Sequence, residues 1–208
     1  EVLTNYEGGL KLTLFDRTTH FNVSGFYYDY HNYQSFETVG VSLVVRNKEA
    51  RVKGLEFEFN TRPVEGLYLQ TFLTLLDTKV KHVVVPSGDI LDRKMPQAPA
   101  VSLGGLARYE FTAGPGRFAI QTNWKYDSHQ YFSTFNAPVD REPGRVIGDA
   151  RIAYTPNALP LEVAFFVNNL TDKAYRLYNL DLSGPFGFTQ ETFARPRWFG
   201  GSLTYRLK

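Results

Sequence analysis

The sequence contains no cysteine and only one methionine among its 208 residues. Without cysteine, a disulfide scaffold, a thiolate metal site and a cysteine nucleophile are all excluded. An excess of one charge is also missing, because 23 basic and 21 acidic side chains give a formal net charge of +2. There is therefore no electrostatic case for a nucleic-acid partner. No apolar run approaches the roughly 18 residues that a membrane-spanning helix requires.

Aromatic residues are abundant instead, with 17 Phe, 13 Tyr and 2 Trp. Charged residues make up 21% of the chain and hydrophobic residues 43%, a composition that excludes a disordered protein. The low mean hydropathy excludes a helical membrane protein, but it does not exclude a membrane protein whose polar and apolar residues alternate.

Hydrophobicity alternates with a period of two along almost the whole chain. Residues 55–60 alternate without a fault, and 118–126 and 203–208 follow the same pattern with aromatic residues on one face. This pattern is typical of β-strands, and no segment has a convincing helical period. The sequence predicts an all-β, antiparallel protein of about nine strands, near residues 4–15, 20–34, 51–60, 67–79, 99–111, 117–131, 145–155, 161–171 and 192–207.

Short and long connections alternate between these predicted strands. The short ones are mostly marked by Pro or Gly, as tight turns are. In an up-and-down meander, strict alternation places every tight turn at one end of the sheet and every long loop at the other. The tight turns fall at 16–19, 61–66, 112–116 and 155–160, and the longer connections at 35–50, 80–98, 132–144 and 172–191.

Most of the predicted strands are long enough to cross a lipid bilayer. A tilted transmembrane strand needs about 9–11 residues, whereas strands of globular proteins usually have about five or six. Outer-membrane barrels combine such strands with short periplasmic turns, long extracellular loops and aromatic girdles. Because every backbone group must be paired in lipid, a closed barrel is the only sheet that can span it. The sequence thus predicts an up-and-down transmembrane β-barrel.

Five segments of the sequence are similar, in order, to segments of one known family. Residues 167–175, Val-Asn-Asn-Leu-Thr-Asp-Lys-Ala-Tyr, are similar to its Asn-Leu-x-Asp-x-x-Tyr segment near the C-terminus. The other four are residues 5–11 with 26–30, similar to a common hairpin; 54–58, similar to a Gly-x-Glu-x-Glu strand; 95–99, similar to a Pro-x-x-Pro entry to a strand; and 195–207, similar to the closing strand. Together these segments resemble those of TonB-dependent outer-membrane receptors.

The resemblance implies that residues 1–208 are the C-terminal segment of a 22-stranded barrel, with the plug domain and the N-terminal strands outside them. It implies a place in the outer membrane of a Gram-negative bacterium and the import of a scarce nutrient such as a ferric siderophore. The implied partners are outer-membrane lipid, the TonB complex through the missing N-terminal part, and an extracellular small-molecule ligand such as an iron chelate. No cofactor and no enzymatic activity are implied.

Two other classes of protein remain as alternatives. A small passive or structural barrel, complete in these residues, is disfavoured by the odd number of predicted strands, because single-chain bacterial barrels have even numbers. A soluble β-rich binding module is disfavoured by the sorting of the connections and by apolar faces on both outer and central strands.

Histidine and tyrosine near the long connections are the candidate ligand-binding residues. Of the four histidines, His20 falls at the tight-turn end of the predicted sheet and the other three fall near the long-loop end. Imidazoles and phenol rings there suit contacts with a metal chelate or an aromatic ligand. The alternative is that they are ordinary interfacial or packing residues. The candidates are His31, Tyr33, His82, His129 and Tyr131, and no resident metal site is predicted.

Paired carboxylates at Glu56 and Glu58 suggest acid–base chemistry, because residues two apart share a strand face. A structural role is favoured, since lumen-facing Glu commonly forms ion pairs with basic residues such as Lys11, Arg51 or Lys53 on neighbouring strands. No nucleophile–base signature marks a catalytic site. The sequence therefore does not predict an enzyme, and three further arginines are expected to join the inward network: Arg108, Arg151 and Arg206.

Overall fold

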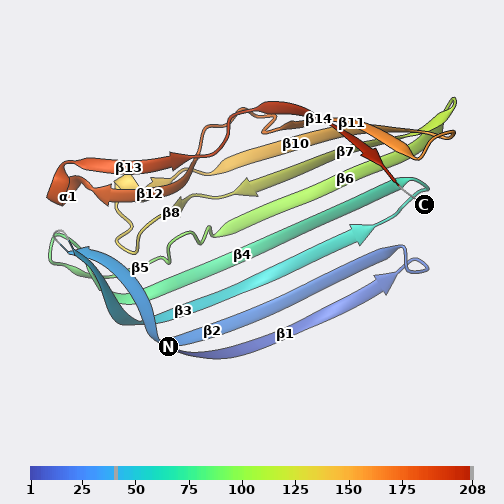
Figure 1. The fold of residues 1–208 in the computed structure, drawn as a ribbon. Coiled ribbons are helices and arrows are strands. Elements are labelled where there is room, and N and C mark those ends of the chain that lie inside the picture. Colours follow the sequence, from blue (N-terminus) through green and yellow to red (C-terminus); the bar gives the residue numbers. More distant parts are fainter. Residues whose placement is uncertain (40–41, 207–208) are drawn as a thin grey trace.

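The computed structural model describes residues 1–39 and 42–206, and nine of its strands form one antiparallel meander. Neighbours in the sequence of the meander are neighbours in the sheet (Figure 1), as the alternating pattern predicted. The nine strands are β1 (Val2–Leu14), β2 (Thr19–Val39), β3 (Ser42–Thr61), β4 (Leu67–Val84), β6 (Val101–Ala113), β7 (Gly116–Asp127), β10 (Arg145–Pro156), β11 (Leu161–Asn168) and β14 (Trp198–Tyr205).

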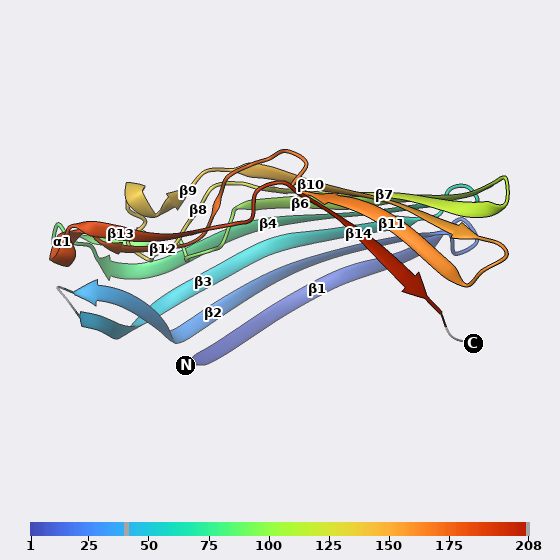
Figure 2. The ribbon, with the colours of Figure 1, turned by 45° about the horizontal axis from the view of Figure 1, so that its top comes forward.

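The sheet is open and curved like a trough. Figures 1 and 2 show β1 and β14 as its two outer strands, and within the described residues each of these strands pairs on one side only. A curved antiparallel meander with two unpaired outer edges is an arc of a barrel, because edges disappear only when the sheet closes. Within the same residues, no helix is both long and apolar enough to cross a membrane.

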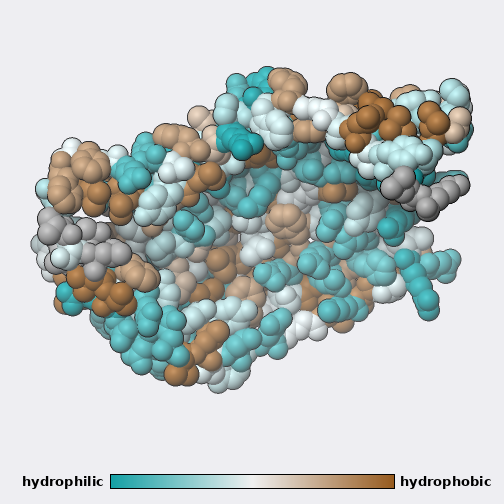
Figure 3. Space-filling view, in the orientation of Figure 1, coloured by the Kyte–Doolittle hydropathy of each residue, from teal (hydrophilic) through white to brown (hydrophobic). Residues whose placement is uncertain are grey.

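The two faces of the sheet differ in chemistry because the strand period is two. On one face Ile120 lies opposite Ile152 and Tyr126 lies opposite Val146. These apolar side chains are well exposed, so we assign this convex face to lipid. Figure 3 looks onto the other, hollowed face, where polar side chains gather. The exposed apolar side chains of the outer face also include Leu10, Leu12, Leu55, Phe59, Leu103, Phe165, Phe199 and Leu203.

A chain of aromatic rings crosses three strands at the tight-turn end of the outer face. Tyr109 and Phe111 on β6 stack at 5.5 Å between ring centroids, and Phe111 lies 5.6 Å from Phe118 on β7. Phe118 in turn lies 4.8 Å from Tyr154 on β10. Aromatic rings in a row across neighbouring strands are typical of the girdle at a membrane–water interface.

The connection predicted over residues 35–50 is not a loop, because β2 and β3 continue through most of it as a paired hairpin. A bulge places two residues of β2, His31 and Asn32, opposite the single residue Glu49, and Asn32 has a φ of 60°. The bulge keeps Tyr30 and Tyr33 on the same inward face. It also breaks the alternation in the sequence, which is why the strand pattern appeared to end near residue 34.

The other three long connections contain short elements of their own. β5 (Ile90–Arg93) pairs with the end of β4. The connection between β7 and β10 holds β8 (Gln130–Tyr131), η1 (Pro138–Asp140) and β9 (Arg141–Glu142). The connection between β11 and β14 holds β12 (Arg176–Leu182), α1 (Ser183–Phe186) and β13 (Phe188–Phe193).

The last predicted strand, 192–207, needs a correction at its start. Residues 192–193 belong to β13, which pairs with β12 outside the main sheet, and β14 begins only at Trp198. Four non-strand residues, among them Pro196, precede β14. Proline cannot donate to a ladder, which accounts for the later start. Leu207 lies outside the described residues.

Residues 1–208 expressed alone are expected to aggregate in water and not to form a stable monomer in detergent. The reason is that β1 and β14 leave unpaired backbone groups along both edges of the sheet. Size-exclusion chromatography and the mobility of unheated samples on SDS gels measure this. A monodisperse species whose gel mobility changes on heating would contradict it.

In the complete barrel, Val23→Arg is expected to lower the free energy of unfolding by roughly 2–4 kcal/mol, because this side chain lies on the lipid-facing surface in mid-strand. The matched variant Ser24→Arg places the same charge on the inward face, opposite Glu56. That variant should be nearly neutral. Urea unfolding in lipid vesicles separates the two, and equal losses from both variants would refute the assignment of faces.

Candidate functional site

The connection between β7 and β10 holds the long-loop end of the sheet together. Its Thr134 hydroxyl accepts a hydrogen bond from Ser35 of β2 at 2.9 Å, and both side chains are fully buried. Its Asn136 accepts a hydrogen bond from the backbone N–H of Lys94, just after β5, at 2.7 Å. Because buried polar groups require partners, these contacts fix the connection between two other parts of the chain.

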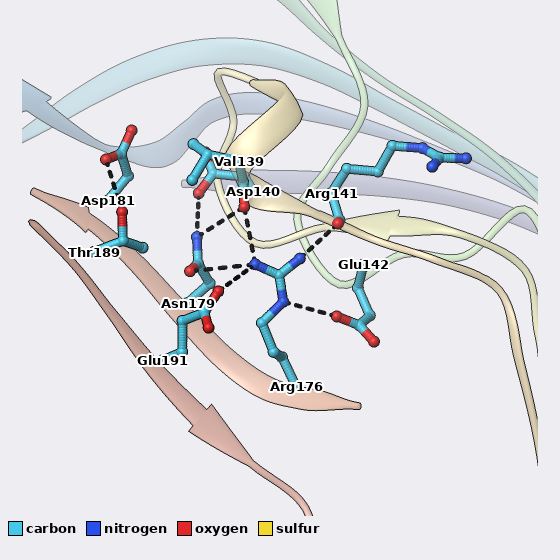
Figure 4. A network of polar contacts seen from close by, with 9 residues as sticks. All are labelled: Val139, Asp140, Arg141, Glu142, Arg176, Asn179, Asp181, Thr189 and Glu191. Atoms are coloured by element: carbon cyan, nitrogen blue, oxygen red, sulfur yellow. Dashed lines mark hydrogen bonds and ion pairs between the residues drawn. The ribbon is translucent and has the colours of Figure 1, made fainter. Parts of the chain in front are cut away.

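The β12–β13 hairpin is fastened to the same connection through Arg176 (Figure 4). Its Nε lies 2.9 Å from Glu142 Oε2, and its Nη1 lies 2.8 Å from Glu191 Oε1. The guanidinium also donates to the carbonyls of Val139, at 2.9 Å, and Arg141, at 2.6 Å. Partial burial lowers the pKa of Arg176, but hydrogen bonds to the two glutamates outweigh this effect and raise the pKa above its ordinary value. Arg176 therefore stays charged at any physiological pH.

A second contact beside Arg176 joins the same two segments. Asn179 of β12 donates to Asp140 Oδ1 at 2.8 Å, and both side chains are buried. The other oxygen of Asp140 accepts a hydrogen bond from Ser133. A buried carboxylate is costly unless it is hydrogen-bonded, so this aspartate requires the hairpin to be in place.

An apolar cluster lies at the same end of the sheet, where Phe135 of the β7–β10 connection packs against it. Val80, Val83 and Val85 of the β4 end are buried with Ala50 of β3, and Tyr33 packs against them. A register shift in β4 between Val80 and Val83 keeps both valines fully buried, although they are three residues apart. The loops at this end therefore have a small core of their own.

A cavity of about 500 Å³ lies on the inner face, against Tyr175, just before β12, and Leu177 of β12. Arg145 of β10 and Lys125 of β7 both contact one carboxylate, Asp127, at 3.4 Å and 3.0 Å. The ring of Tyr175 covers the Arg145 guanidinium, with 4.7 Å between the guanidinium carbon and the ring centroid. Both ion-pair partners of the aspartate face inward by register.

The predicted ligand-binding residues lie in separate places at this end. Tyr33 is half-buried and in edge contact with Tyr30, 6.0 Å between ring centroids. His31 is exposed and lies 3.0 Å from Glu49. His82 is exposed in the β4 irregularity, with a φ of 55°.

His129 and Tyr131 are the two predicted residues that the structure brings together, with 6.0 Å between ring centroids. Within residues 1–39 and 42–206, no group of three or more His, Asp or Glu side chains is placed to hold a metal ion. The three histidines of this end thus do not form one cluster there.

The expected ion pairs of Glu56 and Glu58 are wrong in their partners. Glu58 accepts a hydrogen bond from Asn22 on β2, as an inward residue should. Arg51 and Lys53, however, alternate onto the outer face, where they pair with Asp29 and Asp77. The expected inward network holds for two of the three arginines, since Arg108 binds Glu110 and Arg151 binds Glu162.

The segment 167–175, which the sequence analysis identified as a family motif, forms a cluster of hydrogen bonds around the buried side chain of Asn169, the Asn169 cluster. Its side-chain oxygen accepts hydrogen bonds from the Thr171 hydroxyl and the Lys173 backbone N–H, and its nitrogen donates to the carbonyl of Arg195. Asp172 accepts a hydrogen bond from the backbone N–H of Arg197. The Asn169 cluster connects the end of β11 to the residues just before β14, so its role in this chain is structural.

Arg176, Asn179 and Arg145 were not predicted as site residues. Arg176 and Asn179 have their partners in another connection, at sequence separations of 34 for the Arg176–Glu142 pair and 39 for the Asn179–Asp140 pair. Arg145 pairs with Asp127 of the neighbouring strand β7. Local periodicity carries no signal for such pairs. The one available clue was that the connections, which the alternating pattern did not assign to strands, contain several charged residues.

Comparison with known proteins identifies the family. The sequence matches the family described as "TonB dependent receptor-like, beta-barrel" over residues 1–170. Among solved structures, the chain is similar to the ferric yersiniabactin uptake receptor FyuA from Yersinia pestis, with a TM-score of 0.79 and 16% identity over 97% of this chain and 29% of that one. It is also similar to BauA, the ferric preacinetobactin receptor from Acinetobacter baumannii, with a TM-score of 0.71 and 22% identity over 97% of this chain and 29% of that one.

A third similar structure is the copper transporter OprC, with a TM-score of 0.71 and 18% identity over 97% of this chain and 31% of that one. At these identities the likeness concerns the fold, and the chain spans less than a third of each of these proteins. The family match covers most of the residues. The chain belongs to the TonB-dependent receptor-like β-barrel family, and it is part of the wall of a barrel in the outer membrane of a Gram-negative bacterium.

Proposed function

We propose that this chain forms part of the wall and several extracellular loops of a receptor that imports a ferric siderophore. The observation that carries the proposal is the match to the TonB-dependent receptor barrel over residues 1–170. Two proteins with the same fold are named as the ferric yersiniabactin uptake receptor and the ferric preacinetobactin receptor, which supports a ferric siderophore as the cargo. In this proposal the receptor transports its ligand and catalyses no reaction on it.

The proposal assigns residues 1–208 to the C-terminal part of a 22-stranded barrel. The plug domain, the earlier strands and the contact with the TonB complex would then belong to other parts of the receptor. The unpaired edges of β1 and β14 support this assignment, because both edges need neighbouring strands in a bilayer.

His129 and Tyr131 are the predicted ligand contacts that the loop structure supports best. They lie in the connection that Ser35, Lys94 and Arg176 hold in place. Aromatic side chains on a fixed loop suit the recognition of a bulky chelate, because little conformational entropy is lost on binding. His31, Tyr33 and His82 stay predictions.

The test is uptake by the complete receptor in a strain that lacks its own siderophore receptors. Cells are grown under iron limitation with ferric catecholate, hydroxamate and carboxylate siderophores supplied one at a time, and with copper as a separate arm. We expect growth to be rescued by one class of ferric siderophore. Failure of every siderophore, or uptake of copper alone, would overturn the proposal.

In the same assay, His129→Ala is expected to weaken the apparent affinity roughly five- to tenfold, the usual cost of one important contact. The control is His20→Ala. His20 lies at the tight-turn end, where it contacts Thr13 at 3.3 Å, and this variant should not change uptake. Equal effects of the two variants would exclude His129 as a ligand contact.

Arg176→Gln is expected to release the β12–β13 hairpin from the β7–β10 connection. The substitution leaves Glu142, whose side chain is 5% exposed, without its cationic partner. Breaking such a buried pair costs about 3–5 kcal/mol. Limited proteolysis of intact cells that carry the receptor should then cleave the hairpin near α1 much faster than in the wild type.

The control for the hairpin is Arg197→Gln. The Arg197–Asp172 pair at 3.3 Å is about half exposed, and exposed pairs contribute less than about 1 kcal/mol. This variant should be cleaved at the wild-type rate. Unchanged proteolysis of Arg176→Gln would show that other contacts hold the hairpin.

A further inference from the structure

The inner-face cavity has the size of a small-molecule site. Its volume of about 500 Å³ lies within the roughly 300–1,000 Å³ range of ligand pockets. Strands β4, β6, β7 and β10 supply its wall. Tyr175, just before β12, and Leu177 of β12 line it as well. These two residues flank Arg176, so the contacts of Arg176 with Val139 and Glu142 also hold this side of the cavity in place.

Most of the cavity lining is apolar. Phe72 of β4, Leu106 of β6 and Ile147 of β10 face the cavity from three strands, and Leu177 faces it from the β12 segment. Other inward residues of the same strands, Gln121 of β7 and Arg151 of β10, are polar. Burial of an apolar group against this lining is favourable at roughly 25 cal/mol per Å².

One corner of the cavity is cationic. Arg145 and Lys125 share the single carboxylate Asp127, and the Ser102 hydroxyl donates to that carboxylate at 2.7 Å as well. Asp149 also lines the cavity, but it accepts the backbone N–H of Asn169 at 2.9 Å. Among the described residues, Asp127 is therefore the one carboxylate within ion-pair distance of these two cations.

The Arg145 guanidinium has an unused donor. Its side chain is 13% exposed, and its Nη1 is buried without a hydrogen-bond acceptor in the described part of the chain. Tyr175 covers the guanidinium at 4.7 Å and stands on a connection, not on a strand of the main sheet. A buried charged donor without an acceptor is costly, and an oxyanion that displaced the ring would remove that cost.

We propose that this cavity binds a small molecule, or one arm of a larger one, in which an aromatic or aliphatic group carries a carboxylate. The apolar part lies against Phe72, Leu106 and Ile147, and the carboxylate binds Arg145 after Tyr175 turns aside. The proposal rests on the cavity alone and does not depend on which chelate the receptor imports.

The test uses the complete receptor, purified in detergent, and two matched probes, 2-naphthoate and its neutral amide 2-naphthamide. The two probes have nearly the same shape and differ in charge. Titration calorimetry should give a dissociation constant for the acid at least about tenfold lower than that for the amide. In Arg145→Gln this preference should disappear, and in Arg145→Lys part of it should remain, because the charge is kept and the planar fork is lost.

The matched control is Arg151→Gln. Arg151 is an inward guanidinium on the same strand, but it pairs with Glu162 and does not line the cavity. This variant should keep the wild-type preference for the acid. Unheated gel mobility and surface expression of each variant check that the barrel has assembled.

Three results would overturn the proposal: equal binding of acid and amide, a preference for the acid that survives Arg145→Gln, or no binding of 2-naphthoate to an assembled receptor. Uptake of siderophores by the same variants is measured separately. If the receptor transports a chelate but does not bind 2-naphthoate, the proposed binding site in the cavity is refuted and the proposed function is not.

Discussion

The rest of the structure depends on one constraint, the alternation of side chains across a hydrogen-bonded antiparallel ladder. Each strand presents one row of residues to lipid and the next row to a polar interior. In β7 this separates Ile120 from Gln121, and in β10 it separates Ile152 from Arg151. The ladder pairs the backbone N–H and C=O groups with one another. One row of side chains then suits contact with lipid, and the other suits the polar interior. Neither the aromatic girdle nor the inward ion pairs would have a fixed place without it.

Beyond the main sheet, the chain is held by buried polar contacts and not by a large core. Ser35 meets Thr134, Asn179 meets Asp140, and Arg176 meets Glu142. Such contacts demand good geometry, because an unpaired buried group is costly. They consequently give the loops defined positions. Defined loops are what a receptor needs in order to recognise one ligand at its mouth and reject others.

The cavity shows how wall and loop depend on each other. Arg145 belongs to a strand, whereas Tyr175, which covers it, belongs to the connection after β11. The hydrogen bonds of the Asn169 cluster fix the position of the first residues of that connection. Arg176 fixes the place where it contacts the β7–β10 connection. The position of one ring over one guanidinium is therefore a product of three separate segments.

The sequence by itself determined the nine-stranded meander, the lipid-facing and inward rows, and the family, because all three depend on local alternation and on short motifs such as residues 167–175. It misjudged residues 35–50, since a bulge at Asn32 reverses the alternation that strand prediction relies on. Only the tertiary structure decided the partners of Arg176 and Asp140, the surroundings of Arg145, and the separation of the histidines. Those contacts join segments that are distant in the chain, and no local period records them.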